Sequence, residues 1–314
     1  MHNDLSNRTI AALDLGSNSF HLLIASVNYG AINKLHRERH LLRLRGEGEN
    51  YIISEEKISE AISVIAKFKV VCEQFSARIY AVATSAIRDS CNREEFVARI
   101  EKETGVRVNI ITGEEEAELS LLSLKYSFPN LPEKYLLFDL GGGSTEFIFV
   151  ENAQIIKKFS LQIGAVRFAN KYCNSEGNII NKDEFISVLK KLLYDVKLFL
   201  DKQNIYECFG MGGTISATAN LIERNINKKA LKFDELKGRT FILSELLLLK
   251  EIVDTASTLN EKKKISGLVE TRADIISAGI QILEVFFNEL SITKISFAGS
   301  GLREGIIMNS LKTI

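Results

Sequence analysis

The 314-residue chain contains few prolines, few cysteines and no excess of either charge. The four cysteines, Cys72, Cys91, Cys173 and Cys208, are scattered, with no Cys-x-x-Cys pair and no histidine pair beside them. This spacing argues against a disulfide framework or a structural zinc site, and favours buried thiols. No apolar stretch reaches the roughly 18 residues of a membrane helix, and the N-terminus lacks the pattern of a secretory signal. We therefore expect a cytoplasmic protein without a membrane partner.

Charge is balanced, because 40 Lys and Arg residues match 40 Asp and Glu residues. Proteins that bind nucleic acid through its backbone usually carry a strongly basic face, so we expect no nucleic-acid partner. Any polyanion must then be bound by local cations. The segment 34–45 is the best source, since Arg37, Arg39, Arg43 and Arg45 fall on alternate positions, which form one face of a strand. A substrate-facing groove wall and a solvated edge strand both fit this pattern.

Two glycine-containing segments, 125 residues apart, carry the clearest functional pattern: Asp14-Leu-Gly-Ser-Asn-Ser19 and Asp139-Leu-Gly-Gly-Gly-Ser-Thr-Glu146. Each lies between two apolar runs, which predicts a strand, a tight turn and a second strand. Glycine lets the turn approach an anion and direct its N–H groups at phosphate oxygens, while hydroxyl groups add donors. One such turn would be an ordinary hairpin, whereas two elaborated copies favour phosphate binding. The expected phosphate-binding residues are Gly16, Ser17, Asn18, Ser19, Gly141, Gly142, Gly143, Ser144 and Thr145.

An aspartate precedes each turn, and a carboxylate in that position would repel a phosphate. It becomes useful when Mg²⁺ stands between the two groups, directly or through water. The sequence therefore predicts magnesium as cofactor, with Asp14 and Asp139 as the metal-organising residues.

The rest of the chain alternates predicted strands and helices, which indicates an α/β fold. We expect helices near 55–75, 93–104, 182–202, 244–257 and 270–290, strands at 78–83 and 294–298, and a strand and turn at 208–214. Thr112 and Glu115 have capping-box spacing and predict the start of another helix, with Ala117, Leu121 and Leu124 on one face. The only prolines, Pro129 and Pro132, follow in a loop that is a natural domain crossing.

Five motifs, in order along the chain, resemble the exopolyphosphatase and guanosine pentaphosphate phosphohydrolase (Ppx/GppA) family. They are Ala-Leu-Asp-Leu-Gly-Ser-Asn-Ser-Phe at 12–20, Thr-Ser-Ala-Ile-Arg at 84–88, Gly-Glu-Glu-Glu-Ala at 113–117, Phe-Asp-Leu-Gly-Gly-Gly-Ser-Thr-Glu at 138–146 and Leu-Arg-Glu-Gly at 302–305. The family lies within the superfamily of acetate and sugar kinases, heat-shock chaperone ATPases and actin. The resemblance implies two ribonuclease-H-like domains flanking a phosphate-binding cleft, over 1–122 plus 300–314 and over 123–299. Family members often carry a further helical C-terminal region, so we expect a short two-domain form.

The resemblance also implies roles for individual residues. From the sequence alone, the glutamates at 114, 115, 116 and 118 are acids that a helix N-terminus favours. By resemblance, Glu116 is the general base and Glu146 a second essential carboxylate, although Glu118 stands where many members have arginine. Arg88 is the first choice for a bidentate phosphate contact, and Arg272 and Arg303 are second choices. A third glycine turn, at 210–214, matches the turn that lies against the nucleotide in the superfamily, and its residues are Gly210, Gly212, Gly213 and Thr214. In this chain it would serve a nucleotide, a distal phosphate or only the fold.

These inferences predict a magnesium-dependent exopolyphosphatase, a phosphoanhydride hydrolase that releases terminal orthophosphate from inorganic polyphosphate. Guanosine pentaphosphate hydrolysis is the closest alternative, and the sequence does not separate the two. A small-molecule kinase of the same superfamily would normally present an aspartate base. A nucleotide-gated binding or filament protein would need large additions that 314 residues hardly accommodate. For the short form we expect either a weaker hold on long polyphosphate chains or dependence on a groove formed by a homodimer.

Overall fold

The computed structural model describes residues 8–28, 31–44, 51–203, 205 and 207–311. Its contacts divide the chain into two compact units, Met1–Ser123 with Leu302–Ile314 (unit 1) and Leu124–Gly301 (unit 2). The chain passes from unit 1 to unit 2 inside helix α4 (Gly113–Ser127), before the loop that holds the two prolines. The domain bounds expected from the sequence stay a prediction.

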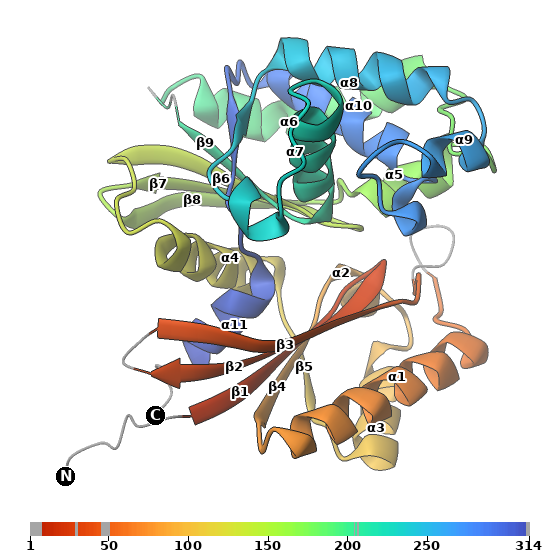
Figure 1. Ribbon diagram of the computed structural model, residues 1–314, viewed down its shortest axis with the longest axis vertical. Helices are drawn as coiled ribbons and strands as arrows, with labels where there is room; N and C mark the ends of the chain where they lie inside the picture. Colours follow the sequence, from red (N-terminus) through yellow and green to blue (C-terminus); the bar gives the residue numbers. More distant parts are fainter. Residues whose placement is uncertain (1–7, 29–30, 45–50, 204, 206, 312–314) are drawn as a thin grey trace. The chain divides into compact units, whose positions relative to one another are not determined.

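Unit 1 contains a five-stranded sheet in the order β3-β2-β1-β4-β5. The strands are β1 (Arg8–Leu15), β2 (Ser19–Asn28), β3 (Ala31–Leu41), β4 (Arg78–Ala83) and β5 (Val108–Ile110). The first three strands are antiparallel, and β4 and β5 continue the sheet in parallel. Helices α1 (Glu55–Gln74) and α3 (Arg93–Thr104) cover one face, and α11 (Leu302–Ser310) packs on the other (Figure 1).

The two faces of this sheet follow from strand periodicity. Leu13, Phe20 and Leu22 are fully buried in the core beneath α1, together with Phe68 of that helix. Because side chains alternate along a strand, Asp14 and His21 lie on the opposite face, the one that α11 covers. Unit 1 thus has an apolar face that holds the sheet together and a second face that carries polar residues.

Unit 2 contains a six-stranded sheet in the order β10-β11-β9-β6-β7-β8. The strands are β6 (Lys134–Leu140), β7 (Thr145–Glu151), β8 (Gln154–Leu161), β9 (Cys208–Met211), β10 (Thr240–Phe241) and β11 (Ile295–Phe297). Three antiparallel strands followed by two parallel ones, β8-β7-β6-β9-β11, repeat the order of unit 1. This repeat confirms the predicted α/β fold with two ribonuclease-H-like sheets.

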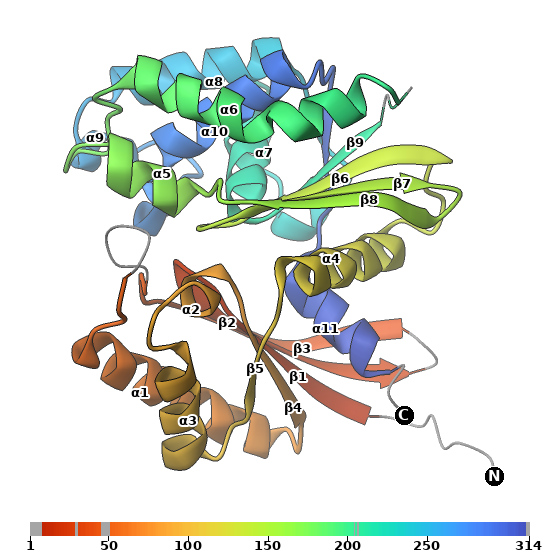
Figure 2. The same cartoon turned by 180° about the vertical axis from the view of Figure 1, so that it is seen from behind.

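Four helices gather on one side of the second sheet (Figures 1 and 2): α6 (Lys182–Leu200), α7 (Gly213–Asn225), α8 (Leu243–Thr255) and α10 (Ile276–Glu289). Their apolar faces form one core with the strands, in which Phe138, Phe147 and Phe286 pack ring against ring. Of the helices in the part of the chain that the structure describes, none is long and apolar enough to cross a membrane.

Several sequence expectations need correction. The helix expected over 270–290 is interrupted, because a 3₁₀ turn, η2 (Glu270–Arg272), precedes α10. Four α-helices among the described residues were not foreseen: α2 (Ser85–Arg88), α5 (Ala165–Tyr172), α7 and α9 (Leu259–Lys263). The four cysteines are free, but only Cys72 and Cys208 are buried, since Cys91 is exposed and Cys173 is half-buried.

Candidate active site

The two glycine segments form turns of the same geometry. The N–H of Gly16 donates to the carbonyl of Ser19 at 3.3 Å, and the N–H of Gly141 donates to that of Ser144 at 3.0 Å. A Cβ added to Gly16 would lie 3.2 Å from the carbonyl oxygen of Ser19, and one added to Gly141 would lie 3.2 Å from that of Ser144. The predicted strand, tight turn and strand are therefore confirmed in both copies.

In each unit, backbone hydrogen bonds hold the turn in place, and they come from the segment after the unit's third strand, β3 in unit 1 and β8 in unit 2. In unit 1, N–H groups of residues 42–44 donate to the carbonyls of Ser17 and Asn18 at 3.0–3.1 Å. In unit 2, N–H groups of residues 165–167, at the start of α5, donate to the first two glycines of the turn at 3.0–3.1 Å. The carbonyl oxygens that would repel an anion are thus satisfied within the protein.

This bracing corrects the prediction of a continuous basic strand face over 34–45. Strand β3 ends at Leu41, because the following N–H groups bond to the turn. Arg43 is exposed and adopts a left-handed backbone with φ of 53°, so it does not extend the strand. Arg37 and Arg39 remain on β3, with Arg37 exposed and Arg39 half-buried. Arg45 lies outside the described residues.

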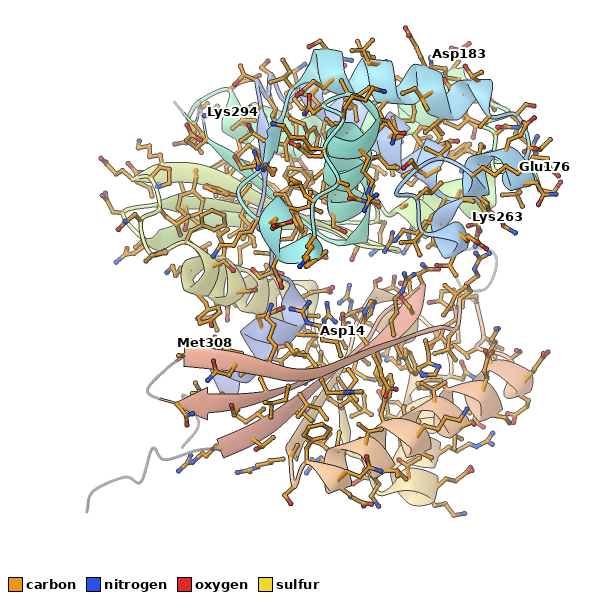
Figure 3. The ribbon with its side chains drawn as sticks, in the orientation of Figure 1. Asp14, Glu176, Asp183, Lys263, Lys294 and Met308 are labelled. Atoms are coloured by element: carbon orange, nitrogen blue, oxygen red, sulfur yellow. The ribbon has the colours of Figure 1, made fainter. Side chains whose placement is uncertain are left out.

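The register of the two sheets places different side chains in equivalent rows. In unit 1, Asp14 (labelled in Figure 3) is paired with His21, which is paired with Arg39. In unit 2, Asp139 is paired with Glu146, which is paired with Ser160. The first row carries basic residues beside its aspartate, whereas the second row carries a further carboxylate.

Side chains around the first turn form a polar cluster. Ser19 Oγ lies 2.9 Å from His21 Nε2 and accepts from Arg39 Nε at 3.2 Å. Ser17 Oγ lies 2.9 Å from the hydroxyl of Ser85, the first residue of helix α2 (Ser85–Arg88). Asn18 is only 8% exposed, and neither polar atom of its side chain has a hydrogen-bond partner among the described residues. An unsatisfied buried amide costs free energy, so this position favours a polar ligand.

Arg88 and Glu116 are brought together in unit 1. Arg88 Nη1 donates to Glu116 Oε2 at 3.0 Å and to the carbonyl of Ile111 at 3.0 Å. Both side chains are largely buried, at 18% and 12% exposure. The guanidinium therefore fixes the orientation of the carboxylate and compensates its charge. Nη1 of Arg88 is used in these two hydrogen bonds, so a phosphate would be bound by the other nitrogens of the guanidinium.

The start of α4 explains why Glu116, rather than a neighbouring glutamate, faces Arg88. Thr112 N–H donates to Glu115 Oε2 at 2.8 Å, and Glu115 N–H donates to Thr112 Oγ1 at 3.1 Å. The predicted capping box is thus confirmed and accounts for Glu115. Glu118 is exposed, whereas Ala117, Leu121 and Leu124 are buried as predicted.

In unit 2, Glu146 is 1% exposed and accepts from Ser160 Oγ at 3.0 Å. A solvent-facing position is usual for a glutamate that opens a strand, so this burial is distinctive. Thr145 Oγ1 donates to the carbonyl of Ile163 at 2.6 Å, so its hydroxyl proton is already used in a hydrogen bond within the protein. Among the hydroxyl groups of this turn, Ser144 is the better candidate donor to a phosphate.

A further glycine turn, at residues 210–214 between β9 and α7, lies beside Asp139 and Arg272. Gly212 has φ of 93°, and a Cβ there would lie 2.3 Å from the carbonyl of Leu140 and 2.9 Å from Asp139 Oδ1. A Cβ on Gly213, the first residue of α7, would lie 1.7 Å from Arg272 Nη2. Glycine at both positions therefore allows the backbone, the carboxylate and the guanidinium to approach one another.

The other two residues of that turn are explained by packing. A Cβ on Gly210 would meet side chains of Ile215 and Ile295 at 3.0 Å. Thr214 is buried, and its methyl group packs against Gly279 of α10. Neither residue needs a ligand to explain its identity.

Arg303 stands second in α11, which packs on β1 and β2. The adjacent acid, Glu304, is paired instead with Lys34 at 2.8 Å. Burial lowers the pKa of Arg39, and the positive charge of Arg303 contributes to that shift. Arg303 therefore adds positive charge to the polar face of unit 1.

A metal site of the magnesium type fits the aspartates at the turns. Among residues 8–28, 31–44, 51–203, 205 and 207–311, no three His, Cys, Asp or Glu side chains are gathered as a metal cage. Mg²⁺ usually takes one or two carboxylates and completes its octahedron with water and substrate phosphate. Asp14 in unit 1 and Asp139 in unit 2, each two residues before its turn glycine, would each supply one such carboxylate.

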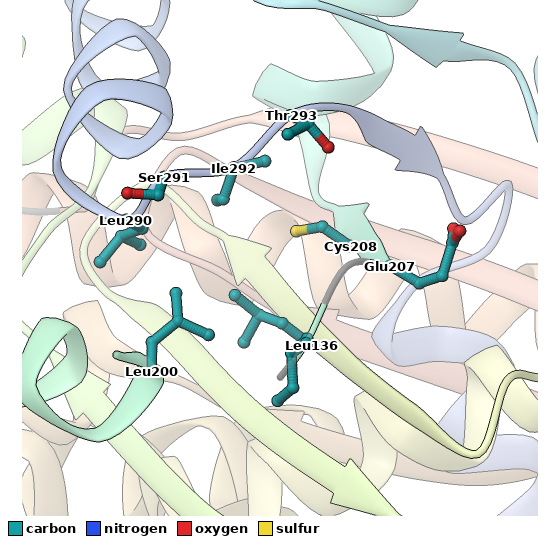
Figure 4. A pocket seen from close by; sticks show the side chains of 9 residues that line it. Leu136, Leu200, Glu207, Cys208, Leu290, Ser291, Ile292 and Thr293 are labelled. Carbon is teal, nitrogen blue, oxygen red and sulfur yellow. The ribbon is translucent and has the colours of Figure 1, made fainter. Parts of the chain in front are cut away.

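A small pocket lies at the far end of β6 and β9 from the glycine turns (Figure 4). Its lining is mostly apolar and includes Leu136, Leu290 and Cys208. Burial raises the pKa of the Cys208 thiol, so Cys208 is not a reactive thiolate. None of the predicted site residues lines this pocket.

Comparisons with known proteins agree with the motifs and the topology. The protein-family model described as the Ppx/GppA phosphatase family matches residues 23–314. A Haemophilus influenzae protein named "Putative exopolyphosphatase" is 30% identical over 306 residues, which cover 96% of this chain and 90% of that protein. The crystal structure of an exopolyphosphatase from Cytophaga hutchinsonii matches with a TM-score of 0.88 at 25% identity, and covers 98% of this chain and 99% of the other. A Ppx/GppA family member from Aquifex aeolicus matches with a TM-score of 0.79 at 26% identity, over 98% of each chain.

Proposed function

The chain belongs to the Ppx/GppA phosphatase family, and from this premise we propose that it is a magnesium-dependent exopolyphosphatase. The reaction is the hydrolysis of the terminal phosphoanhydride bond of inorganic polyphosphate, which releases orthophosphate. The names of the relatives from Haemophilus influenzae and Cytophaga hutchinsonii favour this substrate over guanosine pentaphosphate.

One continuous set of contacts in unit 1 carries the proposal. Ser17 of the first turn contacts Ser85 at the start of α2, and α2 ends at Arg88, which holds Glu116. A phosphate-binding turn, a guanidinium and a buried carboxylate are thereby positioned by one short helix. Hydrolysis of a phosphoanhydride needs positioned donors and a base that orients water, and this set supplies both.

Glu116 is the base in this proposal. Its carboxylate accepts a proton from the attacking water while the bond from the terminal phosphorus to the bridging oxygen breaks. Arg88 keeps the carboxylate in one orientation and offers the remaining guanidinium donors to phosphoryl oxygens. Glu146, held by Ser160, serves as the second carboxylate that positions water or metal.

The turns bind phosphoryl oxygens through backbone N–H groups and through the side chains of Asn18, Ser19 and Ser144. Asp14 in unit 1 and Asp139 in unit 2 each offer a carboxylate to Mg²⁺, which when bound would neutralise charge on the phosphoryl oxygens. Arg272 adds a cation beside Asp139 and the N-terminus of α7.

The test is phosphate release from long-chain polyphosphate, guanosine pentaphosphate and ATP, measured side by side with Mg²⁺ and with a chelator. The proposal predicts the highest kcat/KM for polyphosphate and loss of activity with the chelator. A higher kcat/KM for guanosine pentaphosphate would assign the alternative substrate. Turnover that needs an acceptor such as a sugar or carboxylate would instead indicate a kinase.

A further inference from the structure

Arg39 differs from the other arginines of the segment 34–45. Arg37 and Arg43 are exposed, whereas Arg39 is half-buried on the face of the sheet that α11 covers. Its register position next to His21 and Asp14 places it in the polar row of unit 1. A buried guanidinium is costly unless its donors are satisfied, so the contacts of Arg39 are informative.

Only part of the Arg39 guanidinium is satisfied by the described residues. Nε donates to Ser19 Oγ at 3.2 Å, but Nη2 is buried and has no hydrogen-bond partner. The side chain of Asn18, the residue before Ser19, is in the same condition at both polar atoms. Arg39, which bonds Ser19, and Asn18, the residue before Ser19, therefore both carry buried polar atoms that no described residue satisfies.

A second cation, Arg303, lies at the start of α11. Its neighbour Glu304 bonds Lys34 of β3 at 2.8 Å, so the start of this helix is held against the strand that carries Arg39. The positive charge of Arg303 contributes, after burial, to the lowered pKa of Arg39. Like charges repel in a partly buried setting, so the fold tolerates this pair only at a cost in stability. An anion with several oxygens would accept from both guanidinium groups and remove that cost.

We propose that Arg39, Arg303 and Asn18 form a subsite that binds one phosphoryl group of the substrate, with Arg39 as a positioning residue for that group. The assignment to polyphosphate rests on the proposed function. The equivalent row of unit 2 offers Glu146 and Ser160 instead of His21 and Arg39. His21 and Arg39 in unit 1 therefore suit direct anion contact, whereas Glu146 and Ser160 in unit 2 suit metal or water.

The test compares Arg39→Gln and Arg39→Lys with Arg37→Gln as matched control, since Arg37 is exposed on the same strand. Binding of tripolyphosphate and of orthophosphate is measured by calorimetry in chelator, so that no turnover occurs. We expect Arg39→Gln to weaken tripolyphosphate binding at least tenfold, Arg39→Lys to recover part of the loss, and Arg37→Gln to stay within twofold of the parent.

Thermal unfolding without phosphate separates binding from a merely structural role. If Arg39 and Arg303 repel each other in the free protein, Arg39→Gln leaves the unfolding midpoint unchanged or raises it. A lowered midpoint together with unchanged tripolyphosphate binding would show that Arg39 only supports the fold, and would overturn the proposal. Equal losses in Arg39→Gln and Arg37→Gln would also overturn it, because general charge would then explain the binding.

The two proposals fail in different ways. If the parent binds tripolyphosphate through Arg39 but hydrolyses no polyphosphate, the subsite stands and the proposed function fails. If the parent hydrolyses polyphosphate and Arg39→Gln leaves both its binding and its KM unchanged, the proposed function stands and the subsite fails.

Discussion

Glu116 shows how one residue acquires a chemical role from its surroundings. Three glutamates stand side by side at the start of α4, yet one caps the helix and one is bonded to Arg88. Glu116→Gln keeps the shape of the side chain but removes its ability to accept a proton. We expect kcat to fall by about 10²–10⁴-fold while tripolyphosphate binding in chelator changes little.

Glu115→Gln is the matched control for Glu116→Gln. A glutamine at this position still accepts from the Thr112 N–H, so the capping interaction persists and activity stays near that of the parent. Activity of Glu116→Gln within about threefold of the parent would exclude Glu116 as the base.

Asp139 is the residue through which the metal prediction is tested. Its neighbour Gly212 allows the carboxylate to lie against the glycine turn, a position that a side chain would block. Asp139→Asn keeps the shape but lowers the charge available to a hard cation. We expect the Mg²⁺ concentration for half-maximal rate to rise at least several-fold, measured by titration at saturating polyphosphate. An unchanged titration would contradict a metal-organising role.

At the scale of elements, the junction of β9 and α7 is defined by two glycines with different constraints. A side chain on Gly212 would collide with backbone and would need a left-handed conformation, whereas one on Gly213 would collide only with the end of Arg272. Gly212→Ala should therefore destabilise unit 2 by about 1–3 kcal/mol. Gly213→Ala should keep stability within about 1 kcal/mol, because alanine is the better helix former, and yet displace Arg272.

Activity decides whether Arg272 matters to the reaction. Gly213→Ala should raise the KM for polyphosphate as much as Arg272→Gln does, with urea unfolding as the check on stability. If Arg272→Gln lowers activity and Gly213→Ala leaves it unchanged, the position of Arg272 over Gly213 is irrelevant to function.

The loop after α5 depends on a lysine that the sequence did not reveal. Lys262, the first of three consecutive lysines, is fully buried and donates to Glu176 O, Gly177 O and Asn178 Oδ1 at 2.7–3.0 Å. Burial lowers its pKa. Lys262→Met would leave three acceptors without a donor, so we expect unit 2 to lose about 2–4 kcal/mol. Glu176 and Lys263 mark this corner in Figure 3.

Lys263→Met is the matched control for Lys262→Met. Lys263 is the next residue and is exposed, so its substitution should change the free energy of unfolding by less than about 0.5 kcal/mol. Urea unfolding of both variants measures the difference. Equal stabilities would mean that water replaces the ammonium group without loss.

Local patterns predicted the elements whose determinants are local. The capping box at Thr112, the helix at 93–104 and both hairpins follow from residues within a few positions of one another. The burial of Lys262 and the Arg88–Glu116 pair could not be predicted in the same way, because their partners lie 84–86 and 28 residues away. The end of β3 at Leu41 was missed for the same reason, since Ser17 and Asn18 determine it.

At the scale of the whole molecule, one backbone plan is used twice with different side chains. Both sheets place an aspartate two residues before the turn glycine, but the neighbouring position on the next strand is His21 in unit 1 and Glu146 in unit 2. The chain can therefore have zero net charge and still place histidine and arginine beside the aspartate in one unit and a second carboxylate beside it in the other. Homodimer assembly and a cytoplasmic location stay predictions.

Each unit has its own apolar core, and this organisation predicts how the protein unfolds. Leu13 on β1 and Leu136 on β6 are buried in the cores of the two units. Leu→Ala at such a position costs about 2–5 kcal/mol. If the units unfold as separate cooperative elements, Leu13→Ala lowers the midpoint of one calorimetric transition and Leu136→Ala that of the other. A single transition whose calorimetric and van't Hoff enthalpies agree, lowered by both variants alike, would show instead that the two cores unfold as one.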